Sequence, residues 1–124
     1  MRLGIAGSGM IVRDLFRFIH DVEGIELEAI ASTPKSIDKV KKMAEEEGIK
    51  KYYPDYQHLL DDNEIEVMYI ASPNHLHYSM CKEALEHGKH VICEKPFTSR
   101  VEELEELNNI AKSKKLLLLE AIST

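Results

Sequence analysis

Short apolar runs alternate with amphipathic stretches along the chain. The apolar runs predict six strands, at Arg2–Ala6, Ile25–Ala31, about Lys51–Tyr53, Glu66–Ala71, His90–Cys93 and Leu116–Glu120. Apolar positions three and four residues apart predict helices over Met10–His20, about Ser36–Glu47, Leu76–His87 and about Arg100–Lys112. Strands that alternate with helices predict crossover units, so the expected fold class is α/β, a doubly wound parallel sheet in three layers.

Residues at the ends of the predicted helices support this division. Gly48 and Gly88 follow two of the helices, at the position where a left-handed residue commonly ends one. Asp55 is placed to cap a further helical turn. Ser99 and Glu102 form a capping box at the start of the last helix. These signals predict one continuous domain over residues 1–124.

Composition narrows the class of protein. The chain has 124 residues, with 44% hydrophobic and 31% charged residues, which is the balance of a globular domain. A net charge of −6 argues against a nucleic-acid partner, because no basic excess is present to displace counterions from phosphates. The first apolar run, interrupted by Gly4 and Gly7, is too short for a signal peptide or a membrane span. The expected location is therefore cytoplasmic, with no membrane partner.

Neither cysteine nor histidine spacing indicates a metal site. Cys81 and Cys93 lack the spacing of metal ligands and are expected to be buried, reduced thiols. His75 and His77 lie two residues apart at the start of a helix, so their side chains point in different directions. No metal is expected.

In a doubly wound sheet, ligands bind beyond the carboxyl ends of the strands, so the residues that follow each strand are the candidates. The first strand leads into Gly7, Ser8 and Gly9, and then into Met10 and Ile11 at the start of a helix. Glycines at such a turn allow the backbone to approach a pyrophosphate that the helix N-terminus attracts. The third position of the glycine pattern is valine, so this motif is weak by itself.

The second strand ends in Ser32 and Thr33, with Lys35 nearby. A site selective for NAD usually places an acidic residue here, and none is present. Two hydroxyls and a lysine favour the 2′-phosphate of NADP, although a solvated turn fits the residues equally well. Glu26 and Glu28 lie inside the strand and are expected on a solvated edge or end.

Two further segments follow the fourth and fifth strands and resemble a known family. They are Ala71-Ser72-Pro73-Asn74-His75-Leu76-His77 and the run from Gly88 to Pro96 that ends in Glu94-Lys95-Pro96. Together with the Gly-Ser-Gly turn and the Ala-Ser-Thr end of the second strand, they resemble the glucose–fructose oxidoreductase / inositol dehydrogenase (Gfo/Idh/MocA) family. The resemblance implies a Rossmann fold that binds NAD(P), and it extends over the whole chain.

The resemblance also implies roles for individual residues. Ala71, Ser72, Pro73 and Asn74 would line the cofactor, although Asn74 also suits the N-cap of the next helix. His77 would shape the cofactor cleft, and Glu94 would contact the ribose or the nicotinamide edge. Lys95 would lie beside the nicotinamide and the substrate hydroxyl, as the catalytic residue that stabilises the negative charge that develops there.

In the family, a second domain supplies most contacts to the small-molecule substrate, a sugar, polyol or related alcohol. We expect that domain to be absent from this chain, so that the chain binds a dinucleotide but does not turn over substrate. Leu116–Leu119 is a continuous apolar strand, the pattern of a strand that is covered on both faces. As the last strand of the sheet it is expected to leave an open edge, which favours self-association.

Two other functions are compatible with the sequence. The first is a non-catalytic relative that senses a dinucleotide, against which the presence of Glu94 and Lys95 argues. The second is another Rossmann-like protein, such as a methyltransferase.

Overall fold

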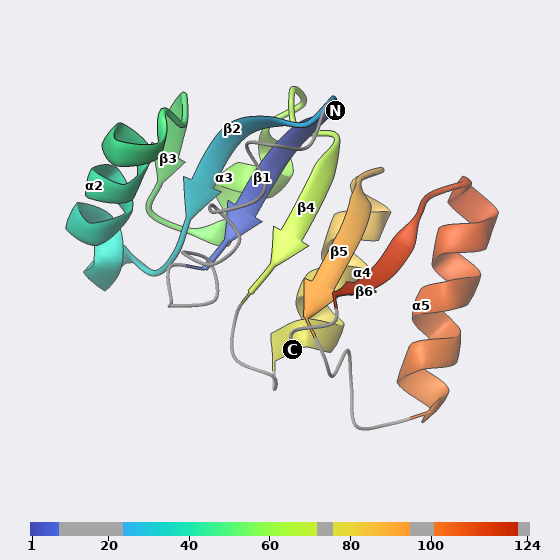
Figure 1. Ribbon diagram of the computed structural model, residues 1–124. Helices are drawn as coiled ribbons and strands as arrows, with labels where there is room; N and C mark the ends of the chain where they lie inside the picture. Colours follow the sequence, from blue (N-terminus) through green and yellow to red (C-terminus); the bar gives the residue numbers. More distant parts are fainter. Residues whose placement is uncertain (8–23, 72–75, 95–100, 122–124) are drawn as a thin grey trace.

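The computed structural model describes residues 1–7, 24–71, 76–94 and 101–121, which form a parallel sheet with helices on both faces (Figure 1). Its six strands are β1 (Arg2–Ala6), β2 (Glu26–Ala31), β3 (Lys51–Tyr53), β4 (Val67–Ile70), β5 (His90–Glu94) and β6 (Leu118–Ala121). Neighbouring strands run parallel in the order β3-β2-β1-β4-β5-β6. The strand order switches direction between β1 and β4, which is the point where doubly wound sheets bind ligands.

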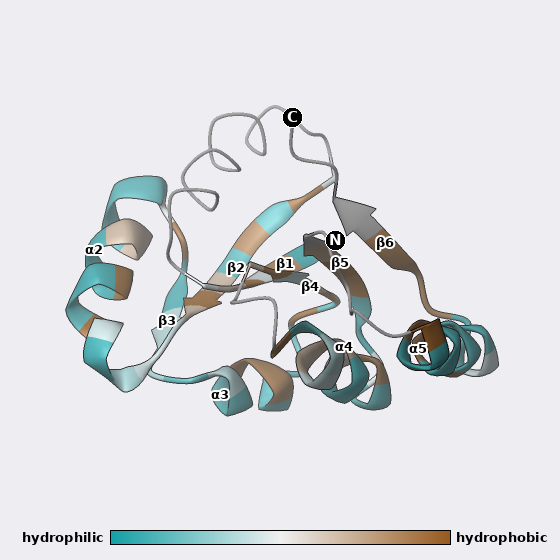
Figure 2. Cartoon of the chain, turned by 90° about the horizontal axis from the view of Figure 1, so that it is seen from below, coloured by the Kyte–Doolittle hydropathy of each residue, from teal (hydrophilic) through white to brown (hydrophobic). Residues whose placement is uncertain are grey.

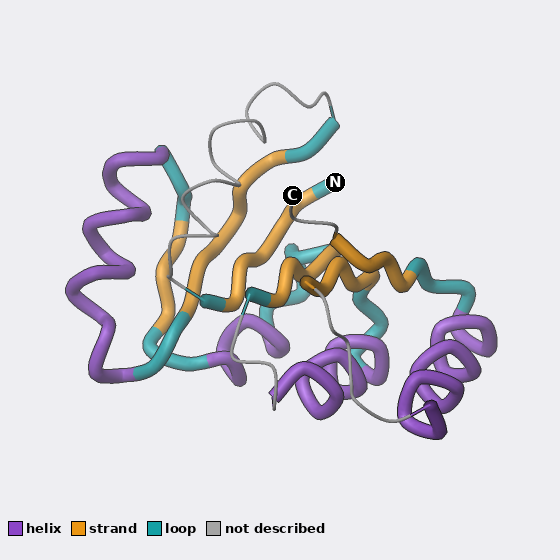
Figure 3. The backbone as a smooth tube through the Cα atoms, turned by 60° about the horizontal axis from the view of Figure 1, so that its bottom comes forward, coloured by secondary structure: helices purple, strands orange, loops and turns teal. Residues whose placement is uncertain are grey.

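The described helices divide between the two faces of the sheet. They are η1 (Pro34–Ser36), α2 (Ile37–Glu47), α3 (Tyr56–Asp61), α4 (His77–Glu86) and α5 (Val101–Lys114). Helix α2 lies on one face, and α3, α4 and α5 lie side by side on the other (Figures 2 and 3). Each face has its own buried cluster, with Val40 and Met43 of α2 in one and Leu59, Leu85 and Leu107 in the other. The fold is the three-layer α/β architecture that the sequence predicts.

The predicted elements that fall within the described residues are confirmed to within a few residues. Gly48 has a φ of 70° and ends α2, and Asp55 caps α3 by accepting a hydrogen bond from the amide of His58. The predicted first helix, Met10–His20, and the cap residue Ser99 lie outside the described residues. Cys81 and Cys93 are confirmed as buried, and neither forms a disulfide.

Strand β6 is confirmed as an edge strand, but only one of its faces is covered by the described residues. Leu116 and Leu118 pack against the cluster beneath α4 and α5. Leu117 and Leu119 are 55% and 51% exposed. The expected covering of both faces is therefore wrong for this part of the chain, whereas the expected apolar edge is present.

The expected solvation of Glu28 is wrong. Leu3 pairs with Leu27 and Gly4 pairs with Ala29, so Glu28 is an extra residue of β2 at a shift in register, as in a β-bulge. Its side chain is 0% exposed. Glu26, at the start of the strand, is exposed as predicted. Alternation along a regular strand cannot reveal the position of Glu28, because the extra residue resets the alternation.

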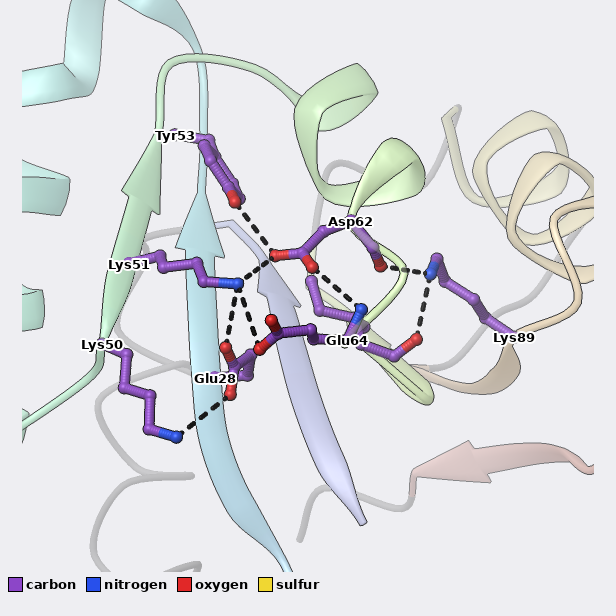
Figure 4. Close-up of polar contacts among 8 residues, drawn as sticks. Glu28, Lys50, Lys51, Tyr53, Asp62, Glu64 and Lys89 are labelled. Carbon is purple, nitrogen blue, oxygen red and sulfur yellow. Dashed lines mark hydrogen bonds and ion pairs between the residues drawn. The ribbon is translucent and has the colours of Figure 1, made fainter.

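Glu28 belongs to an ionic cluster at the amino ends of the strands, together with Lys50, Lys51, Asp62 and Glu64 (Figure 4). The ammonium group of Lys51 lies 3.0 Å from Glu28 Oε2 and 2.9 Å from Asp62 Oδ2. Within the described residues, neither carboxylate oxygen of Glu28 has a hydrogen bond of favourable geometry. Ion pairing with the lysines is therefore what offsets the desolvation of this carboxylate.

Two further side chains complete the cluster. The hydroxyl of Tyr53 donates to Asp62 Oδ2 over 2.9 Å. The buried ammonium group of Lys89 donates to the carbonyl oxygens of Asp62 and Ile65, at 2.8 and 2.9 Å. Burial lowers the pKa of Lys89, because the charged form loses water. The segment between α3 and β4 is thus held by charged groups on both sides.

Candidate cofactor site

A cavity of about 710 Å³ opens at the opposite end of the sheet, beyond the carboxyl ends of the strands. Its described lining comes from the segments that follow β1, β2, β3 and β4 and from the first turns of α4. The lining residues are Ala6, Gly7, Ala31, Ser32, Thr33, Pro34, Asp55, Tyr56, Ala71, Leu76, Ser79, Met80 and Glu83. A volume of this size is typical of a small-molecule or cofactor pocket.

Gly7 forms the floor of the cavity where β1 and β4 end. Its φ is +130°, and a Cβ atom at this position would lie 2.7 Å from the carbonyl oxygen of Ala71. The amide of Gly7 donates to the carbonyl oxygen of Ala31 over 2.8 Å, and the amide of Ala71 donates to that of Ala6 over the same distance. The ends of three strands are thereby held together with no side chain between them, as close approach of a ligand to the backbone requires.

The end of β2 supplies the hydroxyl side of the cavity. Ser32 and Thr33 line it, and Thr33 is the N-cap of η1, with Pro34 at the first position of that helix. The hydroxyl oxygens of Thr33 and Ser36 lie 3.2 Å apart. Lys35, on η1, is exposed and is not among the described residues that line the cavity, although its neighbours Thr33 and Pro34 are.

Helices α3 and α4 form the opposite wall, which is largely apolar. The hydroxyl of Tyr56 donates to the carbonyl oxygen of Met80 over 2.6 Å and so ties the start of α3 to α4. Burial raises the pKa of Tyr56, and the negative charge of Glu83 adds to this effect. Two carboxylates, Asp55 and Glu83, line the cavity, and the described lining contains no lysine or arginine.

The structure brings together part of the predicted site. Gly7, Ser32, Thr33 and Ala71 all line the cavity. Ser8, Gly9, Met10, Ile11, Ser72, Pro73, Asn74 and Lys95 lie outside the described residues, so their predicted roles remain predictions. Glu94 is the last residue of β5.

His77 differs from the other described candidates. It is the first residue of α4, its side chain is 1% exposed, and it is not among the residues that line the cavity. The predicted role of His77 in shaping the cleft therefore stays a prediction. The described residues contain no group of three His, Cys, Asp or Glu side chains that could hold a metal ion. They also contain no helix long and apolar enough to cross a membrane.

Sequence reasoning missed the wall made by α3 and α4. Six residues of this wall were not candidates: Asp55, Tyr56, Leu76, Ser79, Met80 and Glu83. One available signal was that the residues after β3 lie beside those after β2, since ligands bind beyond strand ends. The contribution of α4 carries no such signal, because Met80 and Glu83 look like ordinary helix positions.

The cavity has the features of a dinucleotide-binding site in a Rossmann fold. It lies at the switch point of the sheet, and its lining includes Gly7, where an added Cβ atom would clash with the carbonyl oxygen of Ala71. It also combines an apolar wall with hydroxyl groups at the end of β2. These are the features by which Rossmann folds accommodate a ribose and a pyrophosphate. The architecture and the site together define a dinucleotide-binding domain of the Rossmann class.

Comparison with known proteins identifies the family. Residues 1–121 match the family described as "Oxidoreductase family, NAD-binding Rossmann fold", the Gfo/Idh/MocA family. This match covers nearly the whole chain. The chain therefore belongs to this family and is an NAD(P)-binding domain, as its motifs predict.

Individual relatives agree with this assignment. An uncharacterized oxidoreductase of Rhizobium meliloti is 43% identical over 108 residues, which is 86% of this chain and 32% of the relative. The scyllo-inositol 2-dehydrogenase (NADP(+)) of Bacillus subtilis is 33% identical over 124 residues, 100% of this chain and 37% of that protein. A 3-ketoreductase from Actinomadura kijaniata, solved with NADP and TDP-benzene, superimposes with a TM-score of 0.90 at 30% identity, over 97% of this chain and 36% of that one. The chain spans about a third of the length of these proteins.

Proposed function

We propose that this chain is the cofactor-binding part of an oxidoreductase that transfers hydride between NAD(P) and a sugar, polyol or related alcohol or carbonyl compound. The observation that carries the proposal is the cavity at the switch point, with Gly7 as its floor and Ser32 and Thr33 at its rim. The relatives described as a scyllo-inositol 2-dehydrogenase and as a 3-ketoreductase support the substrate class. In such a protein the substrate is held mainly by a second domain.

Lys95 is the proposed catalytic residue. It directly follows β5, whose carboxyl end lies in the same row of strand ends as the cavity floor. Hydride departure from an alcohol carbon leaves negative charge on the oxygen, which an ammonium group stabilises. In a full-length protein, Lys95→Ala should lower kcat far more than it weakens cofactor binding. Residues 1–124 by themselves should show no turnover with a panel of polyols, because orientation of the substrate is assigned to the second domain.

NADP is the proposed cofactor, because the end of β2 offers hydroxyls and lacks an acid. The carboxylates Asp55 and Glu83 disfavour a phosphate beside them, so the 2′-phosphate is assigned to the side of Ser32, Thr33 and Lys35. A fluorescence titration with NADPH and NADH tests this choice. NADPH should bind at least as tightly, whereas a tenfold preference for NADH, about 1.4 kcal/mol, would contradict it.

Two lysine substitutions test whether Lys35 contacts the 2′-phosphate. Lys35→Ala should weaken NADPH more than NADH, since only NADPH carries the phosphate. Lys39→Ala, which removes an exposed lysine of α2 that does not line the cavity, should affect both equally or neither. Equal losses for both cofactors in Lys35→Ala would remove Lys35 from the site.

The exposed edge of β6 supports a further part of the proposal, self-association of the chain. Leu117 and Leu119 present an apolar face at an edge without charge or proline between residues 116 and 119. Sedimentation over a hundredfold concentration range should show association, and Leu119→Lys should abolish it. A monomer at all concentrations would reject this part. Two buried cysteines that form no disulfide support a cytoplasmic location.

A further inference from the structure

The two sides of the cavity differ in the hydrogen-bonding groups that they offer. The end of β2 contributes the hydroxyls of Ser32 and Thr33, whereas the α3 and α4 wall contributes the carboxylates of Asp55 and Glu83. Ionised carboxylates only accept hydrogen bonds. The wall therefore favours a ligand group that donates hydrogen bonds and carries no negative charge.

Beside these carboxylates, the same wall of the cavity carries apolar side chains. Tyr56, Leu76 and Met80 line it, and Leu76 is 39% exposed in spite of its apolar side chain. A purine base has apolar faces and a polar edge, so it can cover such a surface while its edge reaches a carboxylate. Of the parts of a dinucleotide, the adenine base matches this wall.

The two carboxylates are not equally available. Asp55 Oδ1 already accepts the amide of His58 at 3.1 Å, and it lies 2.6 Å from Nδ1 of the same residue. Among the described residues, the carboxylate of Glu83 has no hydrogen bond and no ion pair. Glu83 and Tyr56 both line the cavity, and the charge of Glu83 adds to the effect of burial in raising the pKa of Tyr56.

We propose that Glu83 is a specificity-determining residue that selects an adenine base over a 6-oxopurine by accepting a hydrogen bond from the exocyclic amine. This inference rests on the proposed function. Hypoxanthine and guanine carry a carbonyl oxygen at that position, and two acceptors that face each other leave both hydrogen bonds unmade. A site built to accept from an amine rejects analogues that lack it.

Binding of two reduced dinucleotides tests the inference without any turnover. The probes are NADPH and its hypoxanthine analogue, reduced nicotinamide hypoxanthine dinucleotide phosphate, titrated by fluorescence against the chain and its variants. The unaltered chain should bind NADPH at least tenfold more tightly than the analogue. Glu83→Gln should reduce this preference to about twofold, because a carboxamide both donates and accepts.

Glu86→Gln is the matched control, since Glu86 lies on the same helix, is exposed and does not line the cavity. It should keep the tenfold preference.

Glu83→Ala is a second variant, which should also lose the preference, and circular dichroism verifies that each variant is folded. Equal binding of both probes to the unaltered chain, or an unchanged preference in both Glu83 variants, would overturn the inference and leave the proposed function intact. Failure of both probes to bind at all would overturn the inference and the proposed function together.

Discussion

The two ends of the sheet use charge in opposite ways. At the amino ends of the strands, Glu28, Lys51 and Asp62 form a closed cluster in which each charged group faces a partner (Figure 4). At the carboxyl ends, Asp55 and Glu83 line an open cavity with no cation among the described lining residues. The charges at one end of the sheet are thus paired with each other, whereas at the other end two carboxylates line a cavity that a ligand can enter.

We expect the amino end of the sheet to determine stability and the cavity to determine dinucleotide binding. Changes at the amino end should affect the free energy of unfolding and leave dinucleotide affinity unchanged when folded protein is compared. Changes at the cavity should affect affinity first. The following four experiments test this separation, from the largest expected effect to the smallest.

Replacing Lys51 with methionine should cause the largest loss of stability, about 3–4 kcal/mol in the free energy of unfolding, because it leaves the buried Glu28 carboxylate without its nearest cation. Urea unfolding followed by circular dichroism measures it. The double variant Glu28→Leu with Lys51→Met should recover much of the loss. If the single variant is as stable as the unaltered chain, the cluster does not hold this end of the sheet.

Replacing Gly7 with alanine should lower stability by about 2–3 kcal/mol and abolish measurable dinucleotide binding. The new Cβ atom would meet backbone at 2.7 Å, and the φ of +130° is strained for any other residue. Gly24→Ala is the control, because Gly24 also has a positive φ, +86°, but has nothing within 4 Å of the added atom. It should cost about 1 kcal/mol and leave affinity unchanged. Similar results for both variants would show that the contact with Ala71 is unimportant.

Lowering the pH should reduce the stability that the ionic cluster at the amino ends of the strands contributes. Burial by itself would raise the pKa of Glu28 and of Asp62, but contact with Lys51 and its charge more than offset this and hold each pKa below its usual value. The stability that these carboxylates contribute is therefore fully present above about pH 5 and is lost as the pH falls through their lowered pKa values. In unfolding measurements from pH 6 to pH 3, Glu28→Gln should be less stable at pH 6 and should decline less steeply. A slope equal to that of the unaltered chain would contradict the coupling.

The smallest effect is expected from Tyr53→Phe, which removes the hydrogen bond to Asp62 and should cost about 1 kcal/mol. Tyr52→Phe is the natural comparison, since Tyr52 is the exposed neighbour on the same strand. It should change the free energy of unfolding by less than about 0.5 kcal/mol. Equal effects of the two substitutions would mean that the hydroxyl of Tyr53 adds nothing to the cluster.

The sequence predicts the fold well because its signals are local. Apolar runs, Gly48 and Asp55 mark strands and helix ends through contacts within a few residues, and the structure confirms them. The site is predicted only where it follows a strand, as at Gly7, Ser32 and Ala71. Tyr56 and Glu83 become part of the cavity only through the packing of α3 against α4, which no local pattern records.

The extra residue at Glu28 has a consequence for how such chains diverge. A β2 strand without the extra residue would restore regular alternation and would have no position for a buried carboxylate at this point. Lys51, on the neighbouring strand, would then be a cation with one partner fewer. We expect the insertion, the glutamate and the lysine to be inherited as a unit, so that relatives either keep all three or replace them together by apolar residues in a strand one residue shorter.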